Sequence, residues 1–127
     1  MARLATRSAE EPDRRAVLSK ATIRAADRMG LTGRELSEIV GLSPATITRL
    51  HKGEYLLDPA HKSWELATLL VRLVRGLDTI SADDELAARA WFDHFNDHLQ
   101  GVPRERISRV EGLVETVAYV DAFRARV

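Results

Sequence analysis

The sequence predicts an all-α protein in which a helix-turn-helix module is followed by a second, small helical module. Apolar residues recur every three or four positions through most of the chain, which is the spacing of one helix face. Thr32, Ser81 and Ser108 each stand three positions before an acidic residue, an arrangement that begins many helices. No segment shows the strict alternation of a strand, so we expect six or seven helices and no sheet.

Composition restricts the class of protein. The 127 residues suffice for one domain, or for two small modules that share a core. Cysteine is absent, which excludes disulfides and thiolate metal sites and agrees with a reducing compartment. No apolar run approaches the roughly 20 residues of a membrane span, and no secretory signal opens the chain. We therefore expect a cytoplasmic protein without membrane contact.

Charge is unevenly distributed although the net charge is zero. Residues 1–28 hold seven Lys or Arg against four Asp or Glu, a net charge of +3, and residues 77–101 hold one Arg against six acids, a net charge of −5. A local basic patch is sufficient for binding to nucleic acid, although a single copy would bind weakly. Dimerisation would help by pairing two half-sites.

The first segment divides into an arm and a helix. Residues 1–11 are polar and lack periodicity, so we expect a flexible N-terminal arm. A helix over residues 12–29 follows, with Leu18, Ala21, Ala25 and Met29 on its inner face, and Gly30 ends it. It would support the helix-turn-helix from behind, within a first module over residues 12–77.

Residues 32–53 have the pattern of two short helices joined by a tight turn. Thr32 and Glu35 form a capping box, and the apolar face that follows consists of Leu36, Ile39 and Val40. Gly41 supplies the left-handed conformation that ends the first helix. Ser43 caps the second helix with Pro44 at its first position. Ile47 and Leu50 point to the core, and Gly53 ends the helix.

The outer face of the second helix carries the candidate DNA-binding residues. These are Ser43, Ala45, Thr46, Thr48, Arg49 and Lys52. Thr46 can contact a thymine methyl group or a base edge, and Arg49 can bind guanine bidentately. Lys52 and the amides behind Ser43 suit phosphate. The alternative is an ordinary helical hairpin with a solvated polar face.

A long helix over residues 63–75 has an unusually wide apolar face. Two adjacent stripes contribute to it: Ala67, Leu70, Val71 and Val74 in one, and Leu66, Leu69, Leu73 and Leu77 in the other. Such a width exceeds the need of a surface helix. We expect this helix to be the central core helix and also to pack against a second subunit in a homodimer.

The second module, residues 78–127, begins with a turn. Ser81 and Asp84 resemble a second capping box, and the helix that follows carries Leu86, Ala87, Ala90, Trp91 and Phe95. Turn residues then interrupt the pattern, and a short helix after Pro103 would bury Ile107. Ser108 and Glu111 make a third capping box, which opens a last helix that runs toward Arg124.

A metal or catalytic site has little support. His94 and His98 share a helix face at a spacing that suits zinc, but no third ligand with a recognisable spacing follows. We interpret His94 as a half-buried residue beside Trp91 and Phe95. The serines precede helices as caps, and no glycine-rich phosphate loop is present. We expect no enzyme, no cofactor and no metal.

The residues of the first module resemble a known family. The stretch GRELSEIVGLSPATITRLHKGE is similar to the Xre/Cro/cI repressors, with Gly41, Leu42, Ser43, Ile47 and Gly53 in register. It departs from that pattern at Gly33, where such repressors often carry a Gln that braces the recognition helix.

The second module resembles the C-terminal domain of Xre/MbcA/ParS-type antitoxins. The residues that carry this resemblance occur in the family's order: Trp91, Phe92, Asn96, Leu99, Gly101, Pro103, Ile107, Gly112 and Val117. Two departures concern the loop, because Phe95 replaces a Pro and the spacing from Leu99 to Pro103 is one residue short.

The resemblance implies a type II antitoxin that also represses its own operator. Such antitoxins neutralise a RES-domain toxin, which degrades NAD or uses it to ADP-ribosylate a target, by covering the toxin's active site. The residues implied to bind the toxin are Tyr119, Asp121, Phe123, Arg124, Arg126 and Val127.

Two alternatives stay open. The C-terminal residues read alone suggest a frayed helix end with solvated arginines. The whole chain could be a stand-alone Xre-family transcriptional repressor, whose C-terminal helices serve only for dimerisation or effector binding.

Overall fold

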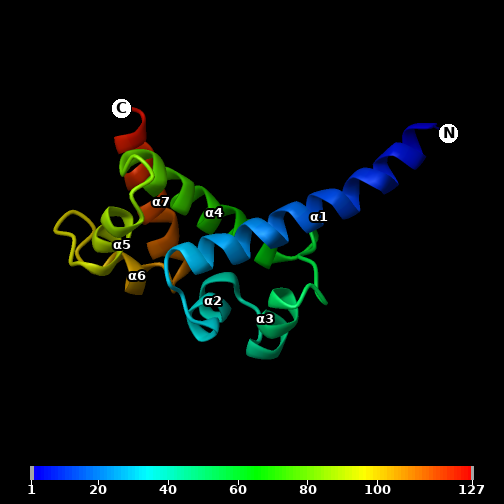
Figure 1. The fold of residues 1–127 in the computed structure, drawn as a ribbon, viewed down its shortest axis with the longest axis horizontal. Coiled ribbons are helices and arrows are strands. Elements are labelled where there is room, and N and C mark those ends of the chain that lie inside the picture. Colours follow the sequence, from blue (N-terminus) through cyan, green and yellow to red (C-terminus); the bar gives the residue numbers. More distant parts are fainter. Residues whose placement is uncertain (1, 127) are drawn as a thin grey trace.

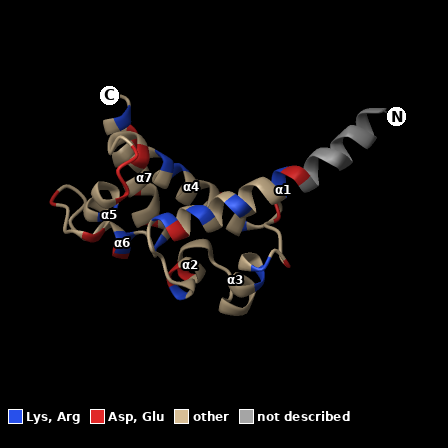
Figure 2. Cartoon of the chain, viewed as in Figure 1, with Lys and Arg blue, Asp and Glu red and all other residues tan. Residues whose placement is uncertain are grey.

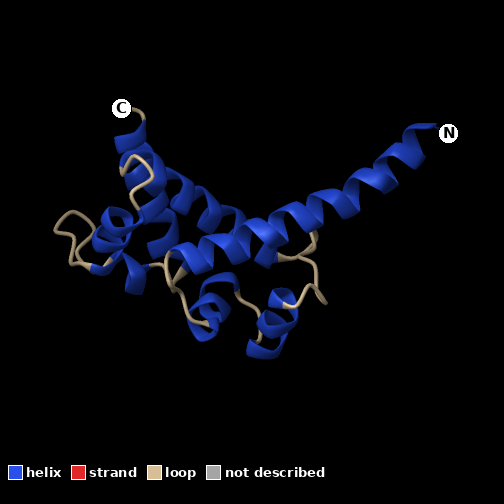
Figure 3. Ribbon diagram, in the orientation of Figure 1, coloured by secondary structure: helices blue, strands red, loops and turns tan. Residues whose placement is uncertain are grey.

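The chain consists of seven helices in the computed structural model, which describes the backbone of residues 2–126 and the side chains of residues 13–126. They are α1 (Ala2–Arg28), α2 (Gly33–Val40), α3 (Pro44–His51), α4 (Lys62–Ile80), α5 (Glu85–Asp93), α6 (Pro103–Arg106) and α7 (Val110–Arg124) (Figure 1). No strand occurs within residues 2–126, as the sequence predicts (Figure 3). One isolated β-bridge joins Asn96 and Gly101 in this part of the chain.

The first helix begins earlier than expected. Its backbone is helical from Ala2, whereas the sequence pattern predicts a helix that begins at residue 12. Periodicity was a poor guide here because a helix needs no apolar face when its residues have high helix propensity. Ala, Arg and Glu, which dominate this segment, are among the best helix formers.

The central element is α4. It continues five residues past the predicted end at residue 75, to Ile80. It packs against α1 and α2 on one side and against α7 on the other (Figure 1). Its wide apolar face is therefore covered within one chain, with Leu66, Ala67, Leu70, Val71, Leu73, Val74 and Leu77 buried. The helix also crosses the expected module boundary after residue 77, so the two modules share it.

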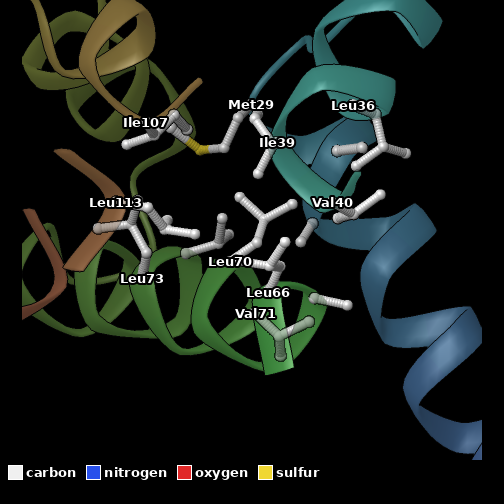
Figure 4. Packing of buried hydrophobic residues seen from close by; sticks show 14 of the residues in the cluster. Met29, Leu36, Ile39, Val40, Leu66, Leu70, Val71, Leu73, Ile107 and Leu113 are labelled. Carbon is white, nitrogen blue, oxygen red and sulfur yellow. The ribbon is translucent and has the colours of Figure 1, made fainter. Parts of the chain in front are cut away.

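One hydrophobic core extends through both modules. Met29 and Ile39 of the first module lie near Leu70 of α4, and Leu73 lies near Ile107 and Leu113 of the second (Figure 4). Met29, Leu70, Leu73 and Leu113 are fully buried, and Ile107 is 1% exposed, as its position predicts. Removing this much apolar surface from water is the main stabilising term of the fold.

Two glycines allow α7 to approach α4 and α6 closely. A Cβ at Gly76 of α4 would lie 2.6 Å from Cγ1 of Val120 on α7. A Cβ at Gly112 would lie 2.0 Å from the carbonyl oxygen of Arg106, which is well inside van der Waals contact. The positions of α6 and α7 therefore depend on the absence of a side chain at residue 112.

The turn before α5 differs from the predicted capping box. Ser81 is the C-cap of the longer α4, and Asp84 is the N-cap of α5, where its side chain accepts a hydrogen bond from the Ala87 amide at 3.2 Å. Ala82 and Asp83 between them have φ angles of 51° and 62°. The prediction failed because α4 uses the first turn residue as its own end. Within α5, Ala88 and Phe92 are buried, whereas Leu86 is 80% exposed.

The third predicted capping box is also absent. Ser108 donates to the carbonyl oxygen of Glu105 at 2.8 Å, which closes the turn after α6. The last helix begins one residue later, with Arg109 at its N-cap and no capping bond from that side chain. The Ser108 hydroxyl serves the preceding helix because α6 ends at Arg106, only two residues before it.

Candidate functional site

The helix-turn-helix forms with the caps that its sequence predicts. The Thr32 Oγ1 accepts a hydrogen bond from the Glu35 amide at 3.1 Å, and the Glu35 carboxylate accepts one from the Thr32 amide at 2.9 Å. Gly41 ends α2 with φ 70°, and its amide donates to the carbonyl oxygen of Ser37. This left-handed residue turns the chain so that α3 can follow within two residues.

The second helix of the motif, α3, presents a polar face outward. Ser43 caps it by accepting from the Thr46 amide at 3.1 Å, and Pro44 occupies the first turn. Ile47 and Leu50 are 2% and 4% exposed, so they fix this helix on the core. The side chains that remain outside are those predicted from the sequence: Ser43, Ala45, Thr48, Arg49 and Lys52 are exposed and Thr46 is half-buried.

Hydrogen bonds and a ring contact determine which groups three of these side chains can present to DNA. The hydroxyl of Thr46 lies 2.8 Å from that of Ser43, and the hydroxyl of Thr48 donates to the carbonyl oxygen of Pro44 at 3.1 Å. With these bonds made, the threonines can present methyl groups, which suit contact with thymine. Arg49 lies over the ring of Tyr55, with Cζ 5.7 Å from the ring centre, so its guanidinium is held at the end of the face.

Gly33, the position at which the sequence departs from the repressor pattern, lies close to α3. A Cβ built there would lie 3.9 Å from Cγ2 of Ile47, an ordinary contact distance. A longer side chain at this position would therefore reach α3, whereas this chain holds α3 through its core residues and the Ser43 cap.

Further basic residues lie beside the motif and are not marked by local sequence spacing. Lys20 and Arg24 of α1 line a hollow of about 470 Å³ together with His51 and Lys52 from the end of α3. Blue segments in Figure 2 mark Lys and Arg along α1 and after α3. Two further arginines of α1 have internal partners: Arg15 donates to the carbonyl oxygens of Leu56 and Leu57, and Arg14 lies over Trp64.

The second surface of interest is an aromatic cluster on α5 and α7. Tyr119 is its centre, with ring-centre distances of 4.7 Å to His98, 5.0 Å to Phe123 and 6.2 Å to Trp91. Phe123 remains 41% exposed. Tyr119 and Phe123, two of the residues implied to bind a toxin, are thus in direct contact.

The other implied toxin-binding residues have different surroundings. Asp121 forms an ion pair with Arg72 of α4, with Oδ2 2.7 Å from Nη2, which fastens α7 to α4. Arg126 lies over the Phe123 ring, with Cζ 5.9 Å from its centre. Arg124 is exposed at the end of α7, and Val127 lies outside the described residues.

The two histidines of the second module, His94 and His98, contact different groups. Nδ1 of His94 lies 2.5 Å from the carbonyl oxygen of Ala90, and His98 stacks on Tyr119. His94 is exposed and not half-buried as predicted, because the helix ends at Asp93 and His94 adopts an extended backbone. Within residues 13–126 no three His, Cys, Asp or Glu side chains gather in an arrangement that could hold a metal ion.

Arginines of the second module hold the end of α1 and the start of α2. Arg104 of α6 donates to Glu35 at 2.8 and 3.0 Å, to Asp93 at 2.7 Å and to the carbonyl oxygen of Met29 at 2.7 Å. Arg89 of α5 donates to the carbonyl oxygens of Arg28 and Asp27 at 2.8 and 3.0 Å. These bonds satisfy the last carbonyl groups of α1, which have no partner within the helix.

The charges of this network stabilise one another. Burial alone would raise the pKa of Glu35, but hydrogen bonds from Thr32 and Arg104 and the positive charge of Arg104 hold that pKa below its ordinary value. Burial alone would lower the pKa of Arg104, but its bonds to Asp93 and Glu35 raise it. Both groups are therefore charged at neutral pH, and the two modules are joined by an ion pair.

The fold and its surfaces define a class. This is an all-helical protein with a helix-turn-helix whose polar face is free, joined through a shared helix to a second module with an exposed aromatic cluster. In the part of the chain that the structure describes, no helix is both long enough and apolar enough to cross a membrane.

Comparison with known families assigns the chain more closely. Residues 8–72 match the family model of the antitoxin Xre-like helix-turn-helix domain, and residues 76–126 match that of the antitoxin Xre/MbcA/ParS C-terminal toxin-binding domain. The chain belongs to the Xre/MbcA/ParS family of antitoxins. No match to an individual curated protein accompanies these two family matches.

Proposed function

We propose that this chain is the antitoxin of a type II toxin–antitoxin pair that neutralises a RES-domain toxin and represses its own operator. The observation that carries the proposal is the direct succession of the two family matches along one chain, residues 8–72 and 76–126. The neutralising mechanism is steric: the second module covers the toxin's active site and carries out no chemistry of its own.

The second module has the surface that such a role requires. Its aromatic cluster supplies rigid apolar groups, and Trp and Tyr are frequent among residues that dominate binding energy. Arg124 and Arg126 lie at the exposed end of α7 near Phe123 and can pair with carboxylates of the toxin. We propose Tyr119, Phe123, Arg124, Arg126 and Val127 as contact residues, with Asp121 positioning α7 through Arg72.

The first module is proposed to bind operator DNA through the outer face of α3. Ser43, Ala45, Thr46 and Thr48 would face the major groove, Arg49 would read a base edge, and Lys52 would contact phosphate. Binding as a homodimer would place two α3 helices on two half-sites and compensate for the zero net charge. A cytoplasmic location follows from both proposed partners.

An activity assay with purified proteins tests the neutralising role. The probe is the protein encoded in the reading frame next to this chain, which the proposal predicts to be a RES-domain toxin, assayed for NAD hydrolysis and for ADP-ribosyl transfer. We expect its activity to fall to background when this chain is added in equimolar amount. Unchanged toxin activity at a large excess of this chain would contradict the proposal and favour a stand-alone repressor.

A further inference from the structure

The second module contains an apolar hollow, and only two of its lining residues, Tyr119 and Phe123, are among the predicted toxin contacts. The hollow has a volume of about 310 Å³ and lies between the end of α4, one face of α5 and the end of α7. Its lining residues are Leu77, Ile80, Ser81, Ala87, Trp91, Tyr119, Val120 and Phe123. Seven of these eight side chains are apolar or aromatic, so the hollow suits an apolar group.

The hollow lies in the part of the molecule where apolar side chains are left exposed. Among the described residues, seven large hydrophobic side chains are strongly exposed, and six of them belong to the second module: Ile80, Leu86, Phe95, Val110, Val114 and Phe123. Where such side chains are contiguous, they are typical of a surface that another protein covers. Ile80 and Phe123, which are 38% and 41% exposed, stand at the hollow itself.

The walls of the hollow are held in place without a partner. Val120 is 1% exposed, and Leu77 is 2% exposed in the shared core. Trp91 and Tyr119 stack with ring planes 17° apart, and Phe123 meets Tyr119 edge to face. A preformed pocket binds a side chain with less loss of conformational entropy than a flexible surface does.

We propose that this hollow receives a large apolar side chain of the toxin and is the anchoring pocket of the complex. The inference rests on the proposed function, because every lining residue falls within the stretch that matches a toxin-binding domain, residues 76–126. It extends the predicted contact surface from the end of α7 to α5 and to the end of α4. Tyr119 and Phe123 belong to both, so the pocket and the C-terminal contacts form one continuous surface.

A pair of matched substitutions on α5 tests the pocket. Ala87 is exposed and lines the hollow, so Ala87→Trp fills it, whereas Ala90→Trp adds the same side chain to the same helix outside the lining. The readout is the affinity for a catalytically inactive form of the adjoining RES-domain protein. We expect Ala87→Trp to weaken binding about 30-fold or more, the loss typical of a blocked anchor, and Ala90→Trp to weaken it by less than about 3-fold.

A second measurement does not depend on a variant. The chain has two tryptophans, Trp91 in the hollow and Trp64 in the first module. In protein labelled with 5-fluorotryptophan, the fluorine resonance of Trp91 should shift on addition of the inactive toxin, while that of Trp64 stays in place.

The outcomes separate this inference from the proposed function. If the wild-type chain and Ala87→Trp bound the inactive toxin with equal affinity, the pocket would be overturned and the antitoxin role would remain intact. Absence of binding by the wild-type chain would refute the proposed function and the pocket together. A Trp91 resonance that shifts with the concentration of this chain alone would assign the hollow to a second copy, and so would also overturn the inference.

Discussion

The Arg104 guanidinium donates to both carboxylate oxygens of Glu35, with Nη1 2.8 Å from Oε1 and 3.0 Å from Oε2, although 69 positions separate the two residues. The same carboxylate accepts the Thr32 amide and so begins α2. One ion pair therefore joins the first helix of the helix-turn-helix to the second module. The orientation of the proposed DNA-binding motif depends on a residue of the toxin-binding domain.

Arg104→Ala should destabilise the protein. The substitution leaves the half-buried Glu35 carboxylate and the Met29 carbonyl without this donor, so we expect the free energy of unfolding to fall by about 2 kcal/mol in urea titrations. Arg109→Ala is the matched control, since Arg109 and its partner Glu111 have side chains 79% and 71% exposed. That variant should be within about 0.5 kcal/mol of wild type. Equal losses for both variants would contradict a special role of Arg104.

The pH dependence of stability should follow the same pair. The pKa of Glu35 is held below its ordinary value of 4.5 in the folded protein, so the folded state is stabilised at pH values above 4.5. This contribution is lost as the pH falls below 4.5 and through the folded-state pKa. The difference in unfolding free energy between wild type and Glu35→Gln should therefore be largest at neutral pH and shrink in acid. A difference that stays constant from neutral pH to pH about 3 would refute the linkage.

Gly112→Ala should prevent the normal packing of α6 against α7. The new methyl group would lie 2.0 Å from the Arg106 carbonyl oxygen, and a backbone group cannot move aside as the end of a side chain can. We expect a loss of about 3 kcal/mol or more, measured by thermal unfolding. Gly33→Ala provides the comparison, since its methyl group meets Ile47 at 3.9 Å, and its melting temperature should be unchanged or slightly higher.

Two substitutions on α3 should separate base reading from phosphate contact. With DNA from upstream of the reading frame, Arg49→Ala should weaken binding to the operator by about 1–3 kcal/mol and bring it closer to binding of random DNA. Lys52→Ala should weaken binding to operator and to random DNA alike, and should lower the slope of log affinity against log salt concentration by about one unit. Fluorescence anisotropy over a range of salt concentrations measures both effects. Operator binding that is unchanged in Arg49→Ala would remove α3 as the reading helix.

The local part of the fold could be predicted because its signals lie within a few residues. The start of α2 is fixed by Thr32 with Glu35, its end by Gly41, and the start of α3 by Ser43 with Pro44. The structure confirms these three helix ends. Ser81 and Ser108 have the same pattern but serve the helices that precede them. Local spacing does not distinguish the end of one helix from the start of the next when the two are separated by a few residues.

The contacts between the modules could not be predicted from spacing. Arg104 and Arg89 were two arginines among many in the sequence, and their roles arise only when α5 and α6 lie against the end of α1. The hollow likewise requires three segments to meet, and Ala87 carries no signal of its own. Identification of the second module came from a resemblance in residue order and not from its hydrophobic pattern.

The central claim is that this chain neutralises a toxin through its second module, and growth of a host that expresses the adjoining reading frame tests it most directly. The comparison includes no partner, the full chain, and a chain that ends after Val120, with cellular NAD measured in each. We predict that the full chain restores growth and the shortened chain does not, since it lacks Phe123 and both terminal arginines. Growth arrest that the full chain fails to relieve would contradict the account.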